Sequence, residues 1–357
     1  MTRCWLSENH VAVTTSGRVL PCTRYKKTEG PNIADDNLHN IFNGPWIGEI
    51  RSQLQDGIKI DGCRKCWHDE DANVESMRQQ FSSKGKWKSK LQSIELAFSN
   101  HCNYSCRHCN SFSSSKWYED DKLLGRPLPN KKLVVFDIEK INNIDDIKYY
   151  KFLGGEPLLN KSHDELLLRI KNVEQVTFEY TTNGSVLPKK EILDIWKRAK
   201  NVIVSVSLDD VFEGFEYFRT GGNFEQVINT CNKLNEYNFI LTFHVVLNAL
   251  NLHRMPEILN FIKNNFPNWN VHFDTVNLPK YLRTGQWSKY EAEQILKQIS
   301  NDRLSKLIKI ECTNEYTNLE EFFKVNKILD KSRKTNLLNV HPVFQKYVDY
   351  QDYCNDL

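Results

Sequence analysis

The feature that most constrains the fold of this 357-residue chain is a regular alternation of short β-like runs with amphipathic helical stretches. Strands separated by helices run parallel and are joined by right-handed crossovers. Ser162 and Asn223 are predicted helix caps between strands. Six such units predict an α/β fold, a partial (β/α)6 TIM-like barrel that binds ligands at the carboxyl ends of its strands. The strand candidates are Ser93–Asn100, Tyr149–Leu153, Val176–Thr182, Val202–Leu208, Leu241–Leu247 and Val271–Val276.

Three parts are predicted along the chain. Residues 1–90 precede the alternation and contain four cysteines, residues 91–280 form the barrel, and residues 281–357 lack strand-like runs. The last part is expected to be a helical extension, because Ser288–Ser300 and Asn318–Lys331 each begin with a capping residue followed three positions later by Glu.

Composition narrows the functional classes. Lys and Arg number 48 against 45 Asp and Glu, so a net charge of +3 gives no electrostatic case for a nucleic-acid or membrane partner. No apolar run approaches the roughly 20 residues that cross a bilayer, and the first ten residues lack a signal-peptide core. We therefore expect a cytoplasmic protein, in which the ten cysteines are thiols or metal ligands rather than disulfides.

One set of cysteines lies directly after the strand candidate Ser93–Asn100. Cys102, Cys106 and Cys109 have the spacing Cys-x-x-x-Cys-x-x-Cys. Three thiolates at this spacing can hold three irons of a [4Fe–4S] cube and leave the fourth iron open for a ligand. A zinc site or three unrelated thiols are the alternatives.

Glycine-rich or polar turns follow the later strands. Singly, each is more often a turn than a site. Their order after the cysteine loop resembles that of the radical S-adenosylmethionine (SAM) enzymes. The turns are Leu153-Gly154-Gly155-Glu156-Pro157, Thr181-Thr182-Asn183-Gly184, Ser207-Leu208-Asp209 and Tyr217-Phe218-Arg219-Thr220-Gly221-Gly222.

The resemblance implies a chemistry and a role for each turn. In that family the open iron binds SAM, and an electron from the cluster splits SAM into methionine and a 5′-deoxyadenosyl radical that abstracts a hydrogen atom. The Gly-Gly-Glu-Pro turn receives the SAM amino group, the other turns receive its carboxylate and ribose hydroxyls, and Arg219 pairs with the carboxylate. The cofactor-binding residues implied are Gly154, Gly155, Glu156, Asn183, Ser207, Asp209 and Arg219.

A second cysteine set precedes the barrel and comprises Cys4, Cys22, Cys63 and Cys66. A hairpin at Thr15-Ser16-Gly17-Arg18 is predicted to bring the first two thiols together. The region resembles the auxiliary-cluster module of SPASM and "twitch" radical SAM enzymes, which implies one auxiliary [4Fe–4S] cluster. It departs from that pattern by having four cysteines instead of seven and by lying before the barrel. A structural zinc site is the alternative.

The resemblance also implies a peptide-modifying oxidoreductase that acts on a ribosomal peptide or protein and takes electrons from a donor such as flavodoxin or ferredoxin. Two alternatives stay open: dehydrogenation of a small polar molecule such as a sugar or aminocyclitol, and a non-catalytic metal-binding scaffold. Cys312 is a candidate hydrogen-atom donor, because epimerising relatives need a thiol for that step. Burial as a packed side chain is its other explanation.

Overall fold

The computed structural model describes residues 2–26, 29–83, 89–129, 137–312 and 318–348. The chain forms two compact units. The first comprises Met1–His101, Pro129–Thr181 and Pro188–Ile203, and the second comprises Cys102–Leu128, Thr182–Leu187 and Val204–Leu357. Within the described ranges, no helix is long and apolar enough to span a membrane.

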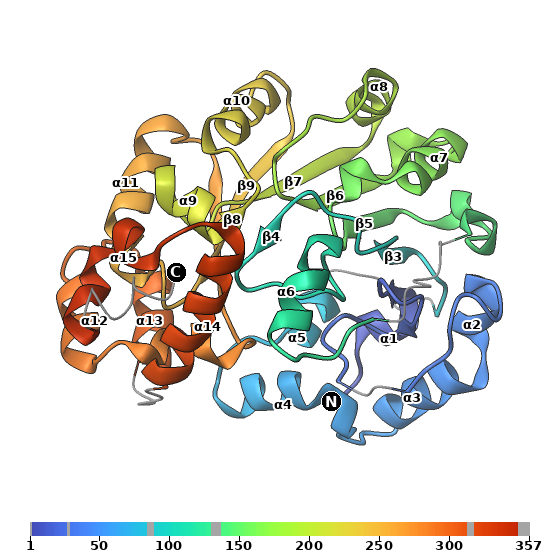
Figure 1. The fold of residues 1–357 in the computed structure, drawn as a ribbon. Coiled ribbons are helices and arrows are strands. Elements are labelled where there is room, and N and C mark those ends of the chain that lie inside the picture. The colour runs from blue at the N-terminus through green and yellow to red at the C-terminus, as the bar shows by residue number, and fades with distance from the viewer. Residues whose placement is uncertain (1, 27–28, 84–88, 130–136, 313–317, 349–357) are drawn as a thin grey trace. The chain divides into compact units, whose positions relative to one another are not determined.

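The first unit is built on a sheet whose strands pair in the order β6-β5-β3-β1-β2. Figure 1 labels three of these strands, β6, β5 and β3. All neighbours are parallel except β1 and β2, and the register aligns His10 with Ser93 and Ser93 with Tyr149. The last residue of β6 belongs to the second unit. The strands are β1(His10–Val13), β2(Val19–Leu20), β3(Ser93–Ala97), β5(Tyr149–Leu153) and β6(Thr177–Thr182).

The predicted N-terminal hairpin is confirmed as β1 and β2, which pair Ala12 with Leu20. Gly17 occupies the turn with φ +79°, a conformation that glycine adopts at little cost. All four residues of β1 are buried, and β1 pairs with β3. The N-terminal segment thus extends the sheet of the barrel strands, which the sequence had not indicated.

Helices connect the strands of the first unit and flank its cysteines. The predicted cap Ser162 is wrong, since Asn160 caps α7 by accepting a hydrogen bond from the Ser162 N–H. The α-helices are α1(Trp5–Asn9), α2(Leu38–Asn43), α3(Pro45–Gln55), α4(Arg64–Asp71), α5(Met77–Ser82), α7(Lys161–Arg169) and α8(Lys190–Arg198). The 3₁₀ turns are η1(Asp61–Cys63), η3(Ile138–Lys140), η4(Ile144–Asp146), η5(Pro157–Leu159) and η6(Val173–Gln175).

The second unit continues the strand–helix alternation. β7(Asn201–Ser207) enters it from the first unit, and β9(Ile240–Leu247) pairs in parallel with β10(Asn270–Thr275). Buried and half-buried residues alternate along β7 and β9, so one face of these strands packs into a core and the other stays partly open. A separate short ladder joins β4(Ser105–Cys106) to β8(Arg219–Thr220).

The helices of the second unit include the predicted C-terminal extension. Asn223, Ser288 and Asn318 each cap a helix as predicted. The α-helices are α6(Tyr118–Leu123), α9(Phe212–Phe218), α10(Phe224–Leu234), α11(Met255–Asn265), α12(Lys289–Leu296), α13(Asp302–Glu311), α14(Leu319–Arg333) and α15(Leu337–Val340). The 3₁₀ turns are η2(Ser115–Trp117), η7(Leu252–Arg254), η8(Lys280–Leu282), η9(Thr284–Gln286) and η10(Pro342–Tyr347).

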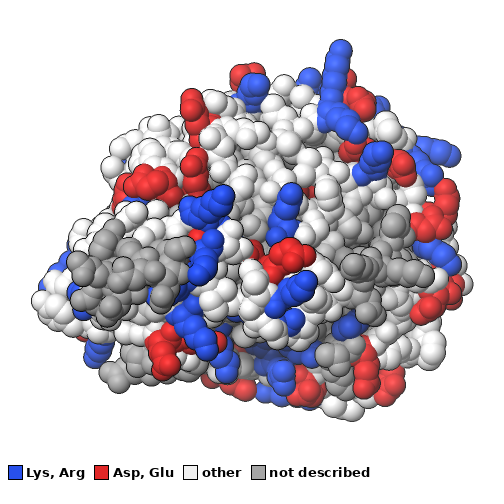
Figure 2. Space-filling model, viewed as in Figure 1, with Lys and Arg blue, Asp and Glu red and all other residues white. Residues whose placement is uncertain are grey.

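The predicted α/β fold class is confirmed, because the six strand candidates correspond to β3, β5, β6, β7, β9 and β10. The division at residues 90 and 280 stays a prediction. Figure 2 shows Lys and Arg interspersed with Asp and Glu over the viewed face, in keeping with the small net charge.

Candidate active site

The three-cysteine loop belongs to the second unit. Cys106 ends β4 and pairs with Arg219 of β8, and the Cys109 N–H donates a hydrogen bond to the Cys106 carbonyl at 2.9 Å. The Cys102 sulfur accepts a hydrogen bond from the Tyr104 N–H at 3.4 Å. Cys102 and Cys106 are buried and Cys109 is half-buried. The loop therefore holds its thiols in a defined, largely dry environment.

Burial and the neighbouring thiols raise the pKa values of two cysteines in this loop. Burial raises the pKa of Cys106 to about 11; Arg219 opposes the shift, and the neighbouring Cys102 adds to it. Burial also raises the pKa of Cys109 to about 12, with further contributions from Cys106 and Cys102. Metal binding to such thiols releases their protons, and a nearby cation favours the thiolate form.

That cation is Arg219, which is 4% exposed. Its Nη1 lies 3.6 Å from the Cys106 sulfur, and its Nη2 lies 2.5 Å from Oδ2 of Asp209. The other carboxylate oxygen of Asp209 accepts a hydrogen bond from the Val246 N–H at 2.8 Å. The buried Nε of Arg219 has no hydrogen-bond partner among the described residues. A buried guanidinium with a spare donor fits an anionic group beside the cysteine loop.

Asn183, the other polar strand-end residue beside the loop, is buried directly after β6. Its Nδ2 donates to Oδ1 of Asn103 at 2.9 Å and lies 3.8 Å from the Cys102 sulfur. Ser207 ends β7 and is half-buried. The second unit thus brings Asn183 and Asp209, which follow β6 and β7, together with the cysteine loop, as strand-end positions are expected to do. Arg219 joins them through the antiparallel pairing of β8 with β4 and not at the end of a sheet strand.

The Gly-Gly-Glu turn belongs to the first unit. Gly154 has φ +104°, and a Cβ on Gly155 would lie 2.1 Å from the His101 carbonyl oxygen. The Glu156 N–H donates to that oxygen at 2.8 Å. Glu156 is buried, and its Oε1 accepts a hydrogen bond from the Leu158 N–H at 3.2 Å. Both glycines are therefore needed where the turn packs on the backbone that runs directly into Cys102.

We predict that Gly155→Ala lowers the free energy of unfolding by about 1–3 kcal/mol, because the new Cβ meets backbone, which cannot move aside as a side chain can. Urea unfolding measures the change. Gly48→Ala in α3 is the matched control: a Cβ there meets nothing within 4 Å, and Ala suits a helix better than Gly. A Gly155→Ala protein as stable as wild type would contradict the prediction.

A buried arginine in the cysteine loop is the main residue that sequence reasoning missed. Arg107 is fully buried, and its Nη2 lies 2.5 Å from Oδ1 of Asp330 on α14. It also donates to Asn326 Oδ1 at 2.9 Å and to the Tyr217 carbonyl at 3.0 Å. No local sequence signal indicates this pairing, since the two charges are far apart in the chain. α14 of the C-terminal extension thereby holds the cysteine loop in place.

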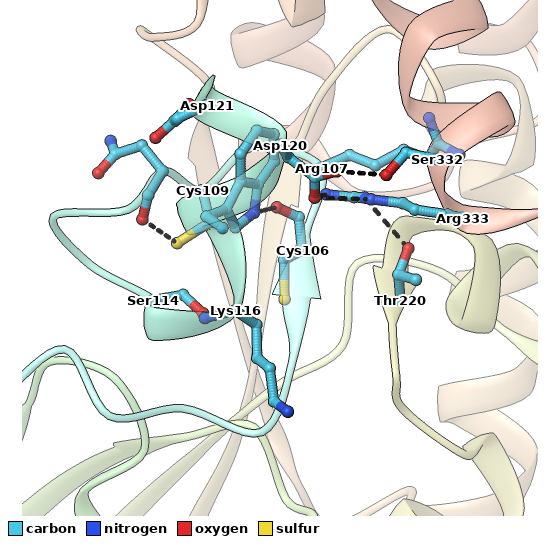
Figure 3. Close-up of polar contacts among 12 residues, drawn as sticks. Cys106, Arg107, Cys109, Ser114, Lys116, Asp120, Asp121, Thr220, Ser332 and Arg333 are labelled. Carbon is cyan, nitrogen blue, oxygen red and sulfur yellow. Dashed lines mark hydrogen bonds and ion pairs between the residues drawn. The ribbon is translucent and has the colours of Figure 1, made fainter. Parts of the chain in front are cut away.

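α14 braces the loop at a second point, shown in Figure 3. Arg333 binds Asp120 of α6 at 2.8 Å and donates to the Thr220 hydroxyl at 3.2 Å. Trp117, next to α6, donates its Nε1–H to the Cys106 carbonyl at 2.7 Å. The segment after Cys109 is therefore an ordered support for the loop where the structure describes it.

The second cysteine set lies within the first unit. Cys4 precedes α1, Cys22 follows β2, Cys63 ends η1 and Cys66 lies in α4. Burial raises the pKa of Cys4 to about 11, with a contribution from Cys66. Burial raises the pKa of Cys22 as well, with contributions from each of the other three thiols. Cys4, Cys22 and Cys63 also pack in one apolar cluster, and their role as metal ligands stays a prediction.

The thiol spacing bears on the zinc alternative. Zinc–thiolate bonds of about 2.3 Å place the sulfurs of a tetrahedral site roughly 3.8 Å apart. Among the described residues, no three of the cysteine sulfurs all lie within 4.8 Å of one another. In this structure neither set therefore presents three sulfurs at the spacing of a single zinc ion.

Cys312 lies at the end of α13 and is buried, with its sulfur 3.8 Å from the Thr284 carbonyl oxygen. Burial raises its pKa to about 11, and Glu311 adds to the shift. These contacts describe a packed thiol, and the hydrogen-donor role stays a prediction. Cys231 of α10 is fully buried in the core, and Cys354 lies outside the described residues.

Family models match both cysteine regions. Residues 96–262 match the model described as the radical SAM superfamily, and residues 4–67 match SPASM, described as an iron–sulfur cluster-binding domain. The three-cysteine loop lies in the first range and the four-cysteine set in the second. The predicted cofactors are thereby confirmed: a [4Fe–4S] cluster with SAM, and an auxiliary iron–sulfur cluster.

Curated relatives match parts of the chain. The radical SAM cyclopropyl synthase TigE of Paramaledivibacter caminithermalis is 30% identical over 169 residues, 44% of this chain and 35% of the relative. The probable GTP 3′,8-cyclase of Methanocaldococcus jannaschii is 27% identical over 50% of this chain and 58% of the relative. The chain thus spans between about a third and three fifths of these relatives' lengths.

Solved structures give more distant likenesses. Native anSMEcpe with bound AdoMet is 16% identical, with a TM-score of 0.41 over 58% of each chain. Streptococcus suis SuiB bound to S-adenosylmethionine is 16% identical, with a TM-score of 0.37 over 71% of this chain and 49% of SuiB. The two family models thus give this chain a radical SAM domain over residues 96–262 and, ahead of it, an iron–sulfur cluster-binding domain of the SPASM type over residues 4–67.

Proposed function

We propose that this chain is an enzyme that reductively cleaves SAM and abstracts a hydrogen atom from its substrate. The observation that carries the proposal is the loop of Cys102, Cys106 and Cys109 with the buried guanidinium of Arg219 beside it. The bound cluster supplies the electron that splits SAM into methionine and a 5′-deoxyadenosyl radical. Three thiols, and not four, would leave one iron open to SAM.

The protein's own residues have distinct proposed roles around SAM. Arg219, held by Asp209, presents its spare Nε–H to the SAM carboxylate. Glu156 offers a carboxylate to the SAM amino group, to which such a charge is complementary. Asn183 and Ser207 supply an amide and a hydroxyl for the polar groups of SAM. A non-catalytic scaffold would need none of these groups, which argues against that alternative.

For the substrate we propose a ribosomal peptide or protein. The support is the SPASM-type domain, since radical SAM enzymes with this module mostly modify peptides. A small polar molecule is the second candidate, favoured by the likeness to GTP 3′,8-cyclases. The electron donor, proposed as a flavodoxin or ferredoxin, can be replaced by dithionite in a test.

The test uses anaerobically reconstituted protein with dithionite and SAM. The protein should form 5′-deoxyadenosine slowly without substrate and faster with it. The substrate is sought among short peptides encoded by neighbouring genes and co-expressed with the enzyme, and mass spectrometry would reveal its modification as a mass change. The same assay with sugars, aminocyclitols and nucleotides tests the second candidate. Absence of 5′-deoxyadenosine from protein with full iron content would refute the enzyme proposal.

A further prediction separates the two cysteine sets. A folded Cys63→Ala protein should still form 5′-deoxyadenosine but yield little or no modified product. The reason is that a cluster with four thiolate ligands has no open iron for SAM and serves only the conversion of the substrate. Liquid chromatography with mass spectrometry measures both compounds. Cys231→Ala, at a buried thiol outside both sets, is the control and should keep both. Product formation at the normal rate by Cys63→Ala would contradict the prediction.

A further inference from the structure

Three potential metal ligands project from the paired strands β9 and β10 in the second unit. His272 aligns with His244 in the parallel register, and Asp274 lies two residues further along β10, on the same face as His272. The Nε2 atoms of His244 and His272 lie 3.5 Å and 3.7 Å from Oδ2 of Asp274. The three ligand atoms all lie within 4.8 Å of one another.

The distances match shared coordination better than direct hydrogen bonding. An N–H···O bond spans about 2.7–3.2 Å, which is shorter than either contact. Ligands bound to one ion at about 2.0–2.2 Å in a tetrahedral site lie roughly 3.4 Å apart, which is close to both. Nε2 of His244 is buried and has no hydrogen-bond partner among the described residues. A buried nitrogen without a hydrogen bond costs free energy, and a metal ion would remove that cost.

The donor set identifies the class of ion. Two imidazole nitrogens and one carboxylate oxygen suit Zn²⁺ or Fe²⁺ and not Mg²⁺ or Ca²⁺, which prefer oxygen ligands. Three protein ligands also leave a coordination position open. We propose that His244, His272 and Asp274 bind a divalent transition-metal ion that keeps an open position for an oxygen or nitrogen atom of a small ligand.

The position of this His–Asp site suggests what that ligand is. Asp274 aligns in register with Val246, whose N–H donates to Asp209 at 2.8 Å, and Asp209 holds Arg219 beside Cys106. His272 and Asp274 are about half exposed, so a ligand can reach the site. The ion would hold a carbonyl, carboxylate or hydroxyl group of the substrate near the site of hydrogen abstraction. This role rests on the proposed function, whereas metal binding itself does not.

Zinc binding to the reconstituted holoenzyme tests the inference. Iron and sulfide are measured first, so that filled cluster sites cannot take up zinc. Isothermal titration with Zn²⁺ should show one site per chain, and His272→Ala and Asp274→Asn should each weaken it by at least about tenfold. Both side chains are about half exposed, so neither variant opens a core. His39→Ala, at an exposed histidine in α2, is the matched control and should bind zinc like wild type.

Equal zinc affinity in wild type and both variants, or a wild-type affinity only in the millimolar range, would overturn the inference. Formation of 5′-deoxyadenosine by the wild-type holoenzyme is measured alongside. A protein that forms 5′-deoxyadenosine but binds no extra zinc would refute the metal site alone. A protein that binds zinc but forms none would refute the proposed function alone.

Discussion

Replacing Cys102, Cys106 and Cys109 together with Ala will abolish 5′-deoxyadenosine formation and remove about four iron atoms per chain, half of the content expected for two [4Fe–4S] clusters. The reason is that the loop supplies the cluster with an open iron, and the four-cysteine set has no open iron for SAM. Iron and sulfide assays, with liquid chromatography and mass spectrometry of the nucleoside, measure both effects.

The outcome also tests whether the two cysteine sets are independent. Because the two cysteine sets lie in different units of the chain, the four-cysteine set should keep its iron in the triple variant. Loss of all the iron would mean that the sets have been divided incorrectly. Undiminished 5′-deoxyadenosine would mean that the loop does not serve SAM. Cys231→Ala should retain full iron content.

Asp330→Ala is expected to lower the free energy of unfolding by about 3–5 kcal/mol, the range for a buried ion pair that loses one partner. Arg107 would be left as a buried charge without its carboxylate, and Asp330 also accepts hydrogen bonds from the Thr335 hydroxyl and the Leu337 N–H. Urea unfolding measures the loss. The variant should also retain its iron less well, because Arg107 lies between Cys106 and Cys109.

Two further variants serve as comparisons for Asp330→Ala. Asp71→Ala removes the exposed partner of Lys59 and should cost at most about 1 kcal/mol, as surface pairs do. The double variant Arg107→Met with Asp330→Leu should lose less than Asp330→Ala, since it leaves no buried charge unpaired. A loss below about 1 kcal/mol in Asp330→Ala would show that the pair does not hold α14 on the loop.

Local sequence patterns identified the parts of this molecule whose structure depends on residues nearby in the sequence. The six strands were visible as short apolar runs, and Asn223, Ser288 and Asn318 were visible as caps, since a cap needs only a side chain and a helix within one turn. The predicted cap Ser162 was wrong because Asn160, two residues earlier, is an equally good capping residue and local sequence does not choose between them.

Local sequence patterns predicted only part of the candidate site. The cysteine loop and the glycine-rich turns are contiguous in sequence, so their spacing and order could be read directly. Parallel strands then place their ends on one side, which explains why Asn183 lies near the loop. Arg219 is placed there instead by the antiparallel pairing of β8 with β4. The role of each residue toward SAM nevertheless remains a proposal.

Sequence patterns were enough to predict the α/β fold class, the two cysteine sets and the resemblance to radical SAM enzymes, because each depends on spacing within a single segment or on the order of segments. The structure was needed to show that β1 pairs with β3, that Asp330 holds Arg107, and that two histidines and an aspartate meet across β9 and β10. These contacts join residues on separate elements. Their partners depend on which elements pack together, and that choice leaves no periodic or local signal in the sequence.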